Sequence, residues 1–263
     1  MTDRQTLLST LNHLLQPERF NDYGPNGLQV EGKSDIRKLI SGVTASRALI
    51  EAAIVAKADA IFVHHGLFWR GQTGVVAGWM KERLKLLLAH DINLFAYHLP
   101  LDAHPELGNN AQLGQKLGFI TPKAVERGEI THLGDQSLGW MATINQKVDQ
   151  KTAENPENLQ KHLENTLKRP VAGVFIARSA IKKVAWCTGG AQSYFEAAIA
   201  AGADAFITGE MSEPQAHLAR ECGVAYFACG HHATERYGAP AVAAHVAAQL
   251  VIEHEFIEID NPA

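Results

Sequence analysis

The sequence has few cysteines and no long apolar run. Its three cysteines, Cys187, Cys222 and Cys229, form no CxxC pair, so we expect neither a disulfide framework nor a thiolate zinc site. No uninterrupted apolar stretch reaches the roughly 18 residues that a membrane span needs. Residues 1–5, MTDRQ, lack the basic and then apolar order of a signal peptide. These absences favour a cytoplasmic protein without a membrane partner.

The chain also lacks a dense basic cluster. Its formal net charge is -4 at pH 7, and because phosphate backbones are bound by basic surfaces, nucleic acid is not expected as a partner. With 46% apolar and 20% charged residues, the composition is that of a globular protein. A length of 263 residues is enough for one large α/β domain or two smaller ones, each with its own core.

Three apolar, strand-like runs end on imidazole and carboxylate side chains. In chain order these side chains are His64 and His65, His98 and Asp102, and His231 and Glu235. Neighbours within a strand face opposite sides of a sheet, but at a strand end followed by Gly66 both rings of the first pair can turn toward one crevice. Neutral imidazole and carboxylate oxygen bind zinc, iron, manganese, cobalt or nickel. The run ends therefore predict a metal site, and the vicinal pair suits two ions better than one.

Two residues on the predicted rim of this site have open roles. His98 and Glu210 can orient a metal ligand, move a proton or complete a hydrogen-bond network. We name both as candidate catalytic residues. His231 and Glu235, four residues apart, share one face if a helical turn begins after Gly230, and a carboxylate there can bridge two cations.

The sequence contains an internal repeat. Residues 51–60 and 196–205 are identical at eight of ten positions. In both copies a strand-like run ending in threonine precedes the repeat, and two further strand-like runs follow it. The order strand, helix, strand, helix, strand therefore occurs twice. This alternation predicts an α/β fold with mainly parallel sheets and covering helices, because parallel strands need crossover connections.

The repeat predicts two pseudo-repeated α/β lobes. We expect the first lobe over residues 1–120, completed by the C-terminal helix of residues 235–263, and the second over residues 121–234. Open parallel sheets bind ligands in the crevice beyond the carboxyl ends of their strands. Since ligand-type side chains fall at corresponding strand ends of both copies, we expect the metal site in the crevice between the lobes.

Five motifs in order carry a resemblance to a known family. They are DYGPNGLQVEG at residues 22–32, HHG at 64–66, HLPLD at 98–102, TGE at 208–210 and GHHATE at 230–235. With these motifs, which span nearly the whole chain, the sequence resembles the GTP cyclohydrolase I type 2 homologue family, also called NIF-three-like dinuclear metal-binding proteins. The resemblance is to the compact form of the family, because the space between the halves does not hold the inserted domain that some members carry.

The resemblance implies a two-domain α/β subunit that assembles into a ring-shaped homohexamer. It also implies two divalent transition-metal ions per chain, for which zinc, iron and manganese are the candidates. The implied ligands are His64, His65, Asp102, His231 and Glu235. A pair of such ions can hold a bridging water and lower its pKa. The family name implies opening of the guanine imidazole ring of GTP, although no P-loop or other phosphate cradle in the sequence supports GTP independently.

Two classes of function stay open. The first is a metal-dependent hydrolase that acts on a nucleotide or a related small molecule. The second is a non-enzymatic, ring-shaped metal-binding scaffold, or a protein that stores or senses metal. Open coordination positions favour catalysis, whereas protein ligands that fill the shells of both ions favour a structural role.

Overall fold

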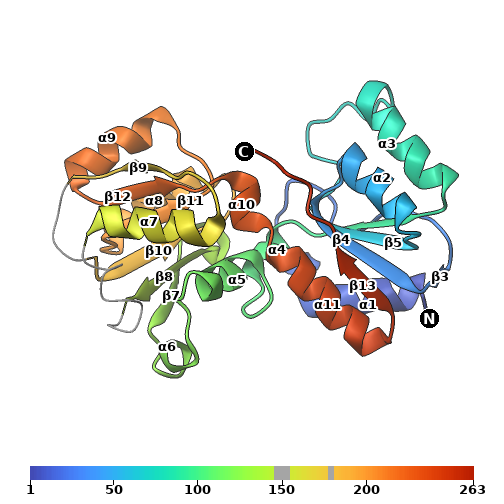
Figure 1. The fold of residues 1–263 in the computed structure, drawn as a ribbon, viewed down its shortest axis with the longest axis horizontal. Helices are drawn as coiled ribbons and strands as arrows, with labels where there is room; N and C mark the ends of the chain where they lie inside the picture. The colour runs from blue at the N-terminus through green and yellow to red at the C-terminus, as the bar shows by residue number, and fades with distance from the viewer. Residues whose placement is uncertain (145–154, 177–180) are drawn as a thin grey trace. The chain divides into compact units, whose positions relative to one another are not determined.

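The computed structural model describes residues 1–144, 155–176 and 181–263. The chain forms two compact units, each built on its own sheet. Unit 1 comprises Met1–Gly108 and Arg236–Asp260, and unit 2 comprises Asn109–Glu235 and Asn261–Ala263. In Figure 1 the first stretch of unit 1 runs from blue to green, and its second stretch is red. The mixed fold confirms the α/β class, and the domain bounds expected from the sequence stay a prediction.

Unit 1 contains a five-stranded sheet in the order β13-β4-β5-β6-β2. The first four strands run parallel, and β2 pairs with β6 antiparallel. The bounds are β2 Gly27–Val30, β4 Lys38–Thr44, β5 Ala60–His65, β6 Asn93–Ala96 and β13 Glu253–Phe256. Residues 39–43 of β4 are all buried. Such continuous burial is typical of parallel strands that are covered on both faces.

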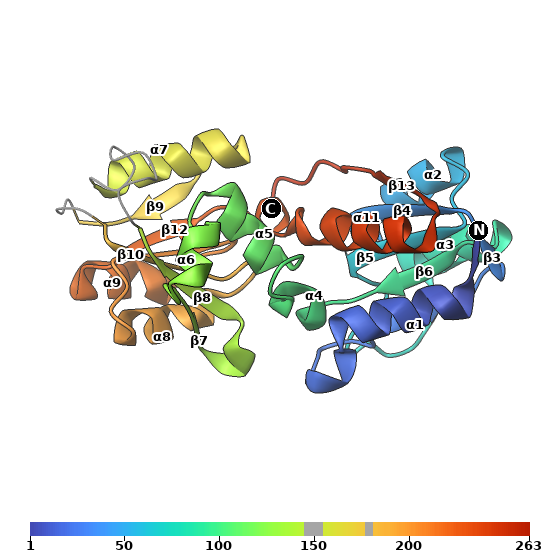
Figure 2. The same ribbon diagram turned by 90° about the horizontal axis from the view of Figure 1, so that it is seen from below.

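Helices cover both faces of this sheet (Figures 1 and 2). Helices α2 and α3 pack on the face that carries Ile40 and Ile61, and helices α1 and α11 pack on the face that carries Leu39 and Phe62. The adjacent residues Leu39 and Ile40 serve opposite cores because side chains alternate along a strand. The bounds are β1 Thr2–Asp3, α1 Arg4–Leu15, η1 Pro17–Arg19, β3 Asp35–Ile36, α2 Arg47–Val55, α3 Gly78–Ala89, α4 Leu99–Ala103 and α11 Gly238–Leu250.

Unit 2 contains a six-stranded sheet in the order β7-β8-β10-β11-β12-β9. Strands β10, β11 and β12 run parallel, whereas β7, β8 and β9 join antiparallel. The bounds are β7 Ile130–Leu133, β8 Gly139–Thr143, β9 Ala172–Val174, β10 Lys183–Trp186, β11 Ala205–Thr208 and β12 Ala225–Ala228. The parallel pairing expected from the repeat is therefore present at the centre of this sheet, with antiparallel strands added outside it.

Helices of unit 2 lie on both sides of its sheet, with α7 on one side and α8 and α9 on the other (Figure 2). The bounds are α5 Asn109–Lys116, α6 Pro122–Glu126, η2 Asp135–Ser137, α7 Pro156–Leu167, η3 Gln192–Tyr194, α8 Phe195–Ala200, α9 Glu213–Cys222 and α10 His231–Glu235. Among the described residues, no helix combines the length and the apolar character that crossing a bilayer demands.

The topology confirms the internal repeat and extends it. The order β4-α2-β5-α3-β6 in unit 1 corresponds to β10-α8-β11-α9-β12 in unit 2. A helix and an antiparallel edge strand precede each copy, α1 and β2 in one and α7 and β9 in the other. A one-turn helix follows each copy, α4 after β6 and α10 after β12. The third parallel strand of each unit thus leads directly into candidate site residues.

The two copies also share an aspartate that caps the first strand. The Asp59 carboxylate accepts hydrogen bonds from the backbone N–H groups of Arg37 and Lys38, at 2.6 and 3.0 Å. The Asp204 carboxylate accepts the two equivalent bonds from residues 182 and 183, both at 2.8 Å. These aspartates occupy the same position of the ten-residue repeat, so the repeated sequence preserves a specific contact as well as a pattern.

Candidate metal centre

Four of the predicted site residues come together in unit 1, at the carboxyl ends of β5 and β6. His64 and His65 are the last residues of β5, His98 immediately precedes α4, and Asp102 lies within α4. His64 and Asp102 are buried, with exposed fractions of 0% and 7%. The chain turns directly after the histidine pair at Gly66, where a β-carbon would overlap another side chain. This local geometry places both adjacent histidines at the end of the strand.

The imidazoles of His64, His65 and His98 form a compact cluster in unit 1. The ring centroids of His64 and His65 are 4.4 Å apart, those of His64 and His98 are 4.9 Å apart, and those of His65 and His98 are 5.7 Å apart. One ring nitrogen from each histidine lies within 4.8 Å of the other two. The Nε2 atom of His64 is also 3.6 Å from Oδ1 of Asp102. This donor set of imidazole and carboxylate fits a divalent transition-metal ion.

Hydrogen bonds to Nδ1 orient the rings of the cluster. Nδ1 of His64 lies 3.2 Å from the backbone oxygen of Tyr97, and Nδ1 of His98 lies 2.7 Å from the carboxylate of Asp22. A carbonyl or carboxylate oxygen only accepts, so each Nδ1 donates, and the neutral ring then carries its lone pair on Nε2. Metal-binding histidines are characteristically held in this way through their second nitrogen.

Asp22 is a site residue to which the sequence alone assigned no role. Its carboxylate accepts hydrogen bonds from Nδ1 of His98 at 2.7 Å, from the Asn26 amide at 2.9 Å and from the backbone N–H of Leu99 at 2.9 Å. Burial acts to raise the pKa of Asp22, but these bonds outweigh it and lower the pKa below its ordinary value. The side chain is therefore held as an anion against His98, and its place in the DYGPNG turn was the signal available in the sequence.

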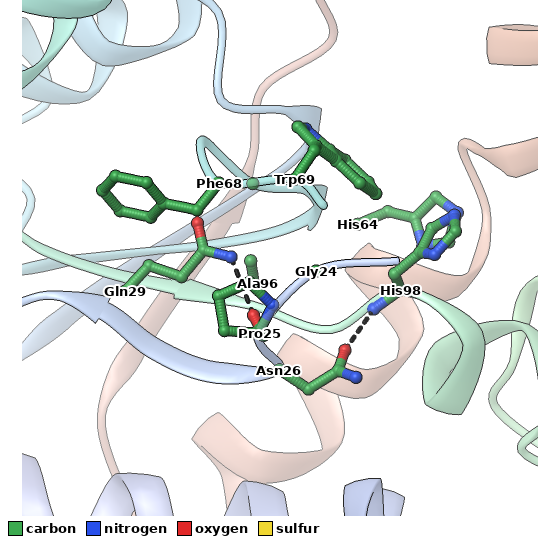
Figure 3. A pocket seen from close by; sticks show the side chains of 10 residues that line it. Gly24, Pro25, Asn26, Gln29, His64, Phe68, Trp69, Ala96 and His98 are labelled. Atoms are coloured by element: carbon green, nitrogen blue, oxygen red, sulfur yellow. Dashed lines mark hydrogen bonds between the residues drawn. The ribbon is translucent and has the colours of Figure 1, made fainter. Parts of the chain in front are cut away.

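A small pocket adjoins the cluster (Figure 3). Its walls include residues 24–26 from the loop before β2 and residues 66, 68 and 69 from the loop after β5. The indole of Trp69 stands edge to face with His98, at a centroid distance of 5.0 Å and an interplanar angle of 89°. Gln29 joins the two loops, since its amide donates to the oxygen of Pro25 at 2.8 Å and accepts from the N–H of Leu67 at 2.8 Å. Oδ1 of Asn26, in the first of these loops, accepts a hydrogen bond from the backbone N–H of His98 at 2.7 Å.

Three further candidate residues come together in unit 2. Helix α10 begins at His231 after Gly230, which has a φ of 94°, as expected from the sequence. Nε2 of His231 lies 3.1 Å from Oε2 of Glu235, one helical turn later. Nδ1 of the same ring lies 2.6 Å from Oε1 of Glu210, which follows β11. The imidazole therefore stands between two carboxylates, one of which, Glu235, is only 3% exposed.

These contacts determine the protonation of His231. Burial acts to lower the pKa of the ring, but the contacts with Glu235 and Glu210 outweigh it and raise the pKa to about 9. A proton that is held between two carboxylates marks a place where positive charge is stabilised. The same donor set fits a divalent cation on Nε2 and the Glu235 carboxylate, with Glu210 retained as the acceptor for Nδ1.

Gly189, which follows β10, leaves room for the Glu235 carboxylate. Its φ of 68° lies in the left-handed region, and a β-carbon at this position would collide with Oε1 of Glu235. The backbone N–H of Gly189 donates to Thr234 Oγ1 at 3.0 Å. Glycine is therefore required here both by the backbone conformation and by the close approach of the acidic side chain.

The fold and these clusters define an α/β protein with candidate metal-binding groups at the carboxyl ends of parallel strands. The chain belongs to the Duf34/NIF3 (NGG1p interacting factor 3) family, whose model matches residues 2–262. The "GTP cyclohydrolase 1 type 2 homolog" of Allochromatium vinosum is 48% identical over 265 residues, covering 100% of this chain and 98% of that protein. The protein of the same name from Pseudomonas aeruginosa is 46% identical, covering 98% of both chains. The family predicted from the five motifs is confirmed.

Solved structures show the same fold. The protein ybgI, described as of unknown function, superposes with a TM-score of 0.89 at 42% sequence identity and covers 100% of both chains. The structure of TTHA1606 from Thermus thermophilus superposes with a TM-score of 0.86 at 30% identity, again over 100% of both chains. This chain is thus similar to its relatives over its whole length.

Proposed function

We propose that this protein binds two divalent transition-metal ions per chain and hydrolyses a nucleotide or a related small molecule. The proposed ligands are His64, His65, Asp102, His231 and Glu235. The observation that carries the proposal is the gathering of His64, His65 and Asp102 in unit 1, where the two ring centroids are 4.4 Å apart and Nε2 of His64 is 3.6 Å from Oδ1 of Asp102. Imidazoles whose second nitrogens are held by protein groups are arranged as in metal sites.

His98 and Glu210 are the proposed catalytic residues. Bound metal would supply Lewis acidity and a water of lowered pKa. Asp22 holds the Nδ1 proton of His98, so that Nε2 is the nitrogen able to accept a proton from a water or a substrate. Glu210 faces Nδ1 of His231 and is 47% exposed at its side chain, so it can orient that ring and exchange protons with solvent.

The substrate class rests on the relatives. Their printed name, GTP cyclohydrolase 1 type 2 homolog, makes GTP the first compound to test, with other nucleotides and phosphoesters next. We also propose the ring-shaped homohexamer as the assembly, for which sedimentation equilibrium would give six times the chain mass of 28.6 kDa.

A metal-binding scaffold without turnover is the second candidate function. Three imidazoles and Asp102 in unit 1 are enough protein donors to complete a tetrahedral shell, as in structural sites. The two candidates differ in whether a coordination position is left for water. Replacing His98 by Asn separates them, because loss of turnover with retained metal supports the hydrolase, and loss of metal or assembly alone supports the scaffold.

The metal content of untagged protein, purified without chelators, tests the proposal. Elemental analysis of the wild type is expected to give two transition-metal equivalents per chain, and Glu235→Ala is expected to reduce that number sharply. The matched control is Glu213→Ala, which removes an exposed carboxylate of α9. Wild-type protein that stays without metal after supplementation with zinc, manganese and iron would refute both candidate functions.

A further inference from the structure

Two aromatic side chains with accessible surface flank the histidine cluster of unit 1. Tyr23, in the loop before β2, is 59% exposed, and Trp69, in the loop after β5, is only partly buried. Their neighbour Phe68 instead packs against the core that contains Ile61. Figure 3 shows the ring of Phe68 directed away from the histidines and the indole of Trp69 directed toward them. Core packing therefore accounts for Phe68 but not for the exposed ring of Tyr23.

Both rings lie against His98, the proposed catalytic residue. The centroid of the Trp69 ring is 5.0 Å from that of His98, and the centroid of the Tyr23 ring is 6.0 Å from it. Trp69 is also 5.9 Å from His65. Aromatic rings attract one another at centroid distances of about 4.5–7 Å. A planar ring that stacks on Trp69 or Tyr23 is therefore held in the neighbourhood of the candidate metal ligands.

Hydrogen bonds between the two loops hold these rings in place. The backbone N–H of Arg70 donates to the oxygen of Tyr23 at 2.6 Å, and Nη2 of Arg70 donates to the oxygen of Asp22 at 2.7 Å. The N–H of Trp69 donates to Oε1 of Gln72 at 3.1 Å. A binding surface that is fixed before the ligand arrives loses less conformational entropy on binding. The two loops thus present the rings in an arrangement that is prepared for a ligand.

The ligand that suits these rings is defined by its flat shape more than by its hydrogen bonds. The adjoining pocket has a volume of about 10 Å³, the space of roughly one water molecule, so a larger group lies outside it. Asn26 and Gln29 line this pocket, but their amide oxygens already accept from the N–H groups of His98 and Leu67. Stacking needs no such groups, because every nucleobase has a π-face.

We propose that Tyr23 and Trp69 form a stacking site for the heteroaromatic base of the substrate. The inference rests on the proposed function, because it assigns the base-binding residues of that site. It narrows the substrate class to compounds that carry a base, and sets phosphoesters without one aside. Since the larger ring system offers more stacking area, purine nucleosides are expected to bind more tightly than pyrimidine nucleosides, with little difference between guanosine and adenosine.

Titration calorimetry on the full, as-purified chain tests the stacking site. Guanosine, adenosine and uridine are the probes with a base, and ribose 5-phosphate is the probe without one. Trp69→Leu and Tyr23→Leu are each expected to weaken guanosine binding at least about fivefold, the lower end of what base–aromatic stacking contributes, and Trp69→Phe is expected to retain most of the affinity. The matched control is Trp79→Leu, which removes a 58% exposed indole of α3 in the same unit and is expected to leave guanosine binding unchanged.

Nuclear Overhauser effects give an independent readout on the unaltered chain. Bound guanosine is expected to show contacts between its H8 proton and the ring protons of Trp69 or Tyr23. This measurement decides the question if Trp69→Leu fails to fold. Guanosine that binds without contact to either ring overturns the proposal, and so does a wild type that binds none of the three nucleosides.

A second copy of the chain is the competing occupant of these exposed rings. Sedimentation of the same variants separates the two: a changed assembly with an unchanged guanosine affinity overturns the proposal and identifies a contact between copies. Metal content and turnover are measured on the same preparations. Guanosine binding that depends on Trp69 in a protein without metal would refute the proposed function and leave the stacking site standing. Bound metal and turnover, with equal guanosine affinities of the wild type and a folded Trp69→Leu variant, would refute the stacking site alone.

Discussion

At the scale of single residues, each unit pairs a carboxylate with the Nδ1 atom of a candidate imidazole. Asp22 and His98 are 2.7 Å apart in unit 1, and Glu210 and His231 are 2.6 Å apart in unit 2. The pairs do not occupy equivalent positions. Strands β6 and β12 correspond in the two copies, and the residue two positions after them is His98 in one and Gly230 in the other. The two copies therefore reach the same arrangement with different residues. A carboxylate in this place fixes the tautomer and the orientation of the ring.

Substitution of Glu210 tests this orienting role. Glu210→Gln is expected to lower metal affinity by roughly 10- to 100-fold, because the imidazole of His231 loses the charged acceptor of its second nitrogen. Competition with a chromophoric chelator measures the affinity. Glu213→Gln is the control, since Glu213 makes a similar pair with His217 at 2.8 Å on the exposed face of α9. Equal affinities of the two variants would argue against the orienting role.

Gly189 gives a second prediction at this scale. Gly189→Ala is expected to lower the free energy of unfolding by about 1 kcal/mol for the left-handed backbone, and by roughly 1–3 kcal/mol more for the collision with Glu235. Gly202→Ala isolates the first contribution, because Gly202 has a φ of 77° and open space around its β-carbon position. Urea unfolding of both variants measures the difference, and equal losses would contradict the collision.

At the scale of helices and strands, the repeat made the central strands predictable. The sequence patterns at residues 6–15 and 80–90 predict two helices. Both are present, as α1 and α3, each within about two residues at its ends. Strand β13 was not predicted. The helix expected over residues 235–263 is wrong beyond Leu250, because α11 ends there and Glu253–Phe256 form a strand instead. The pairing of this strand with β4 joins segments more than 200 residues apart, and no local pattern reports such a contact.

The contact of Asp59 with the start of β4 leads to a prediction about stability. Asp59→Ala is expected to reduce the free energy of unfolding by about 1–3 kcal/mol, because the N–H groups of Arg37 and Lys38 lose their acceptor. Urea unfolding at pH 7 measures the loss. Asp35→Ala, which removes an exposed carboxylate of the same unit, is expected to have a much smaller effect, and similar losses would refute the capping role.

The lowered pKa of Asp59 predicts how the stability of the fold depends on pH. Burial acts to raise the pKa of Asp59, but hydrogen bonds from Lys33, Arg37 and Lys38 outweigh it and lower the pKa below 3.8. Because the folded state holds the anion more strongly, its stabilising contribution is present above pH 3.8 and is lost as the pH falls through the lowered pKa. Unfolding measured from pH 7 down to pH 3 is expected to show a smaller acid-induced loss for Asp59→Asn than for the wild type. An identical pH dependence of both proteins would contradict this assignment.

At the scale of the whole molecule, the sequence predicted the candidate ligands better than their supporting residues. Histidines at the ends of apolar runs are visible locally, and the structure places His64, His65 and His98 together in unit 1. The contact between Asp22 and His98 spans 76 residues, and that between Glu210 and His231 spans 21. Such partners are set by tertiary packing, so only the folded chain identifies them.

Metal binding by the folded chain predicts a change in the stability of the whole molecule. A ligand that binds only the native state at one hundred times its dissociation constant stabilises it by about 2.7 kcal/mol, and for a chain of this size each kcal/mol corresponds to roughly 2–4 °C in Tm. Adding zinc, manganese or iron(II) to chelator-treated protein is therefore expected to raise Tm by about 5–11 °C for each ion, as measured by calorimetry. His65→Gln is expected to reduce this rise, whereas His217→Gln, an exposed histidine of α9, is expected to retain it. A Tm that none of the metals changes would contradict metal binding by the native chain. A rise of equal size in both variants would place the bound ions outside the proposed ligands.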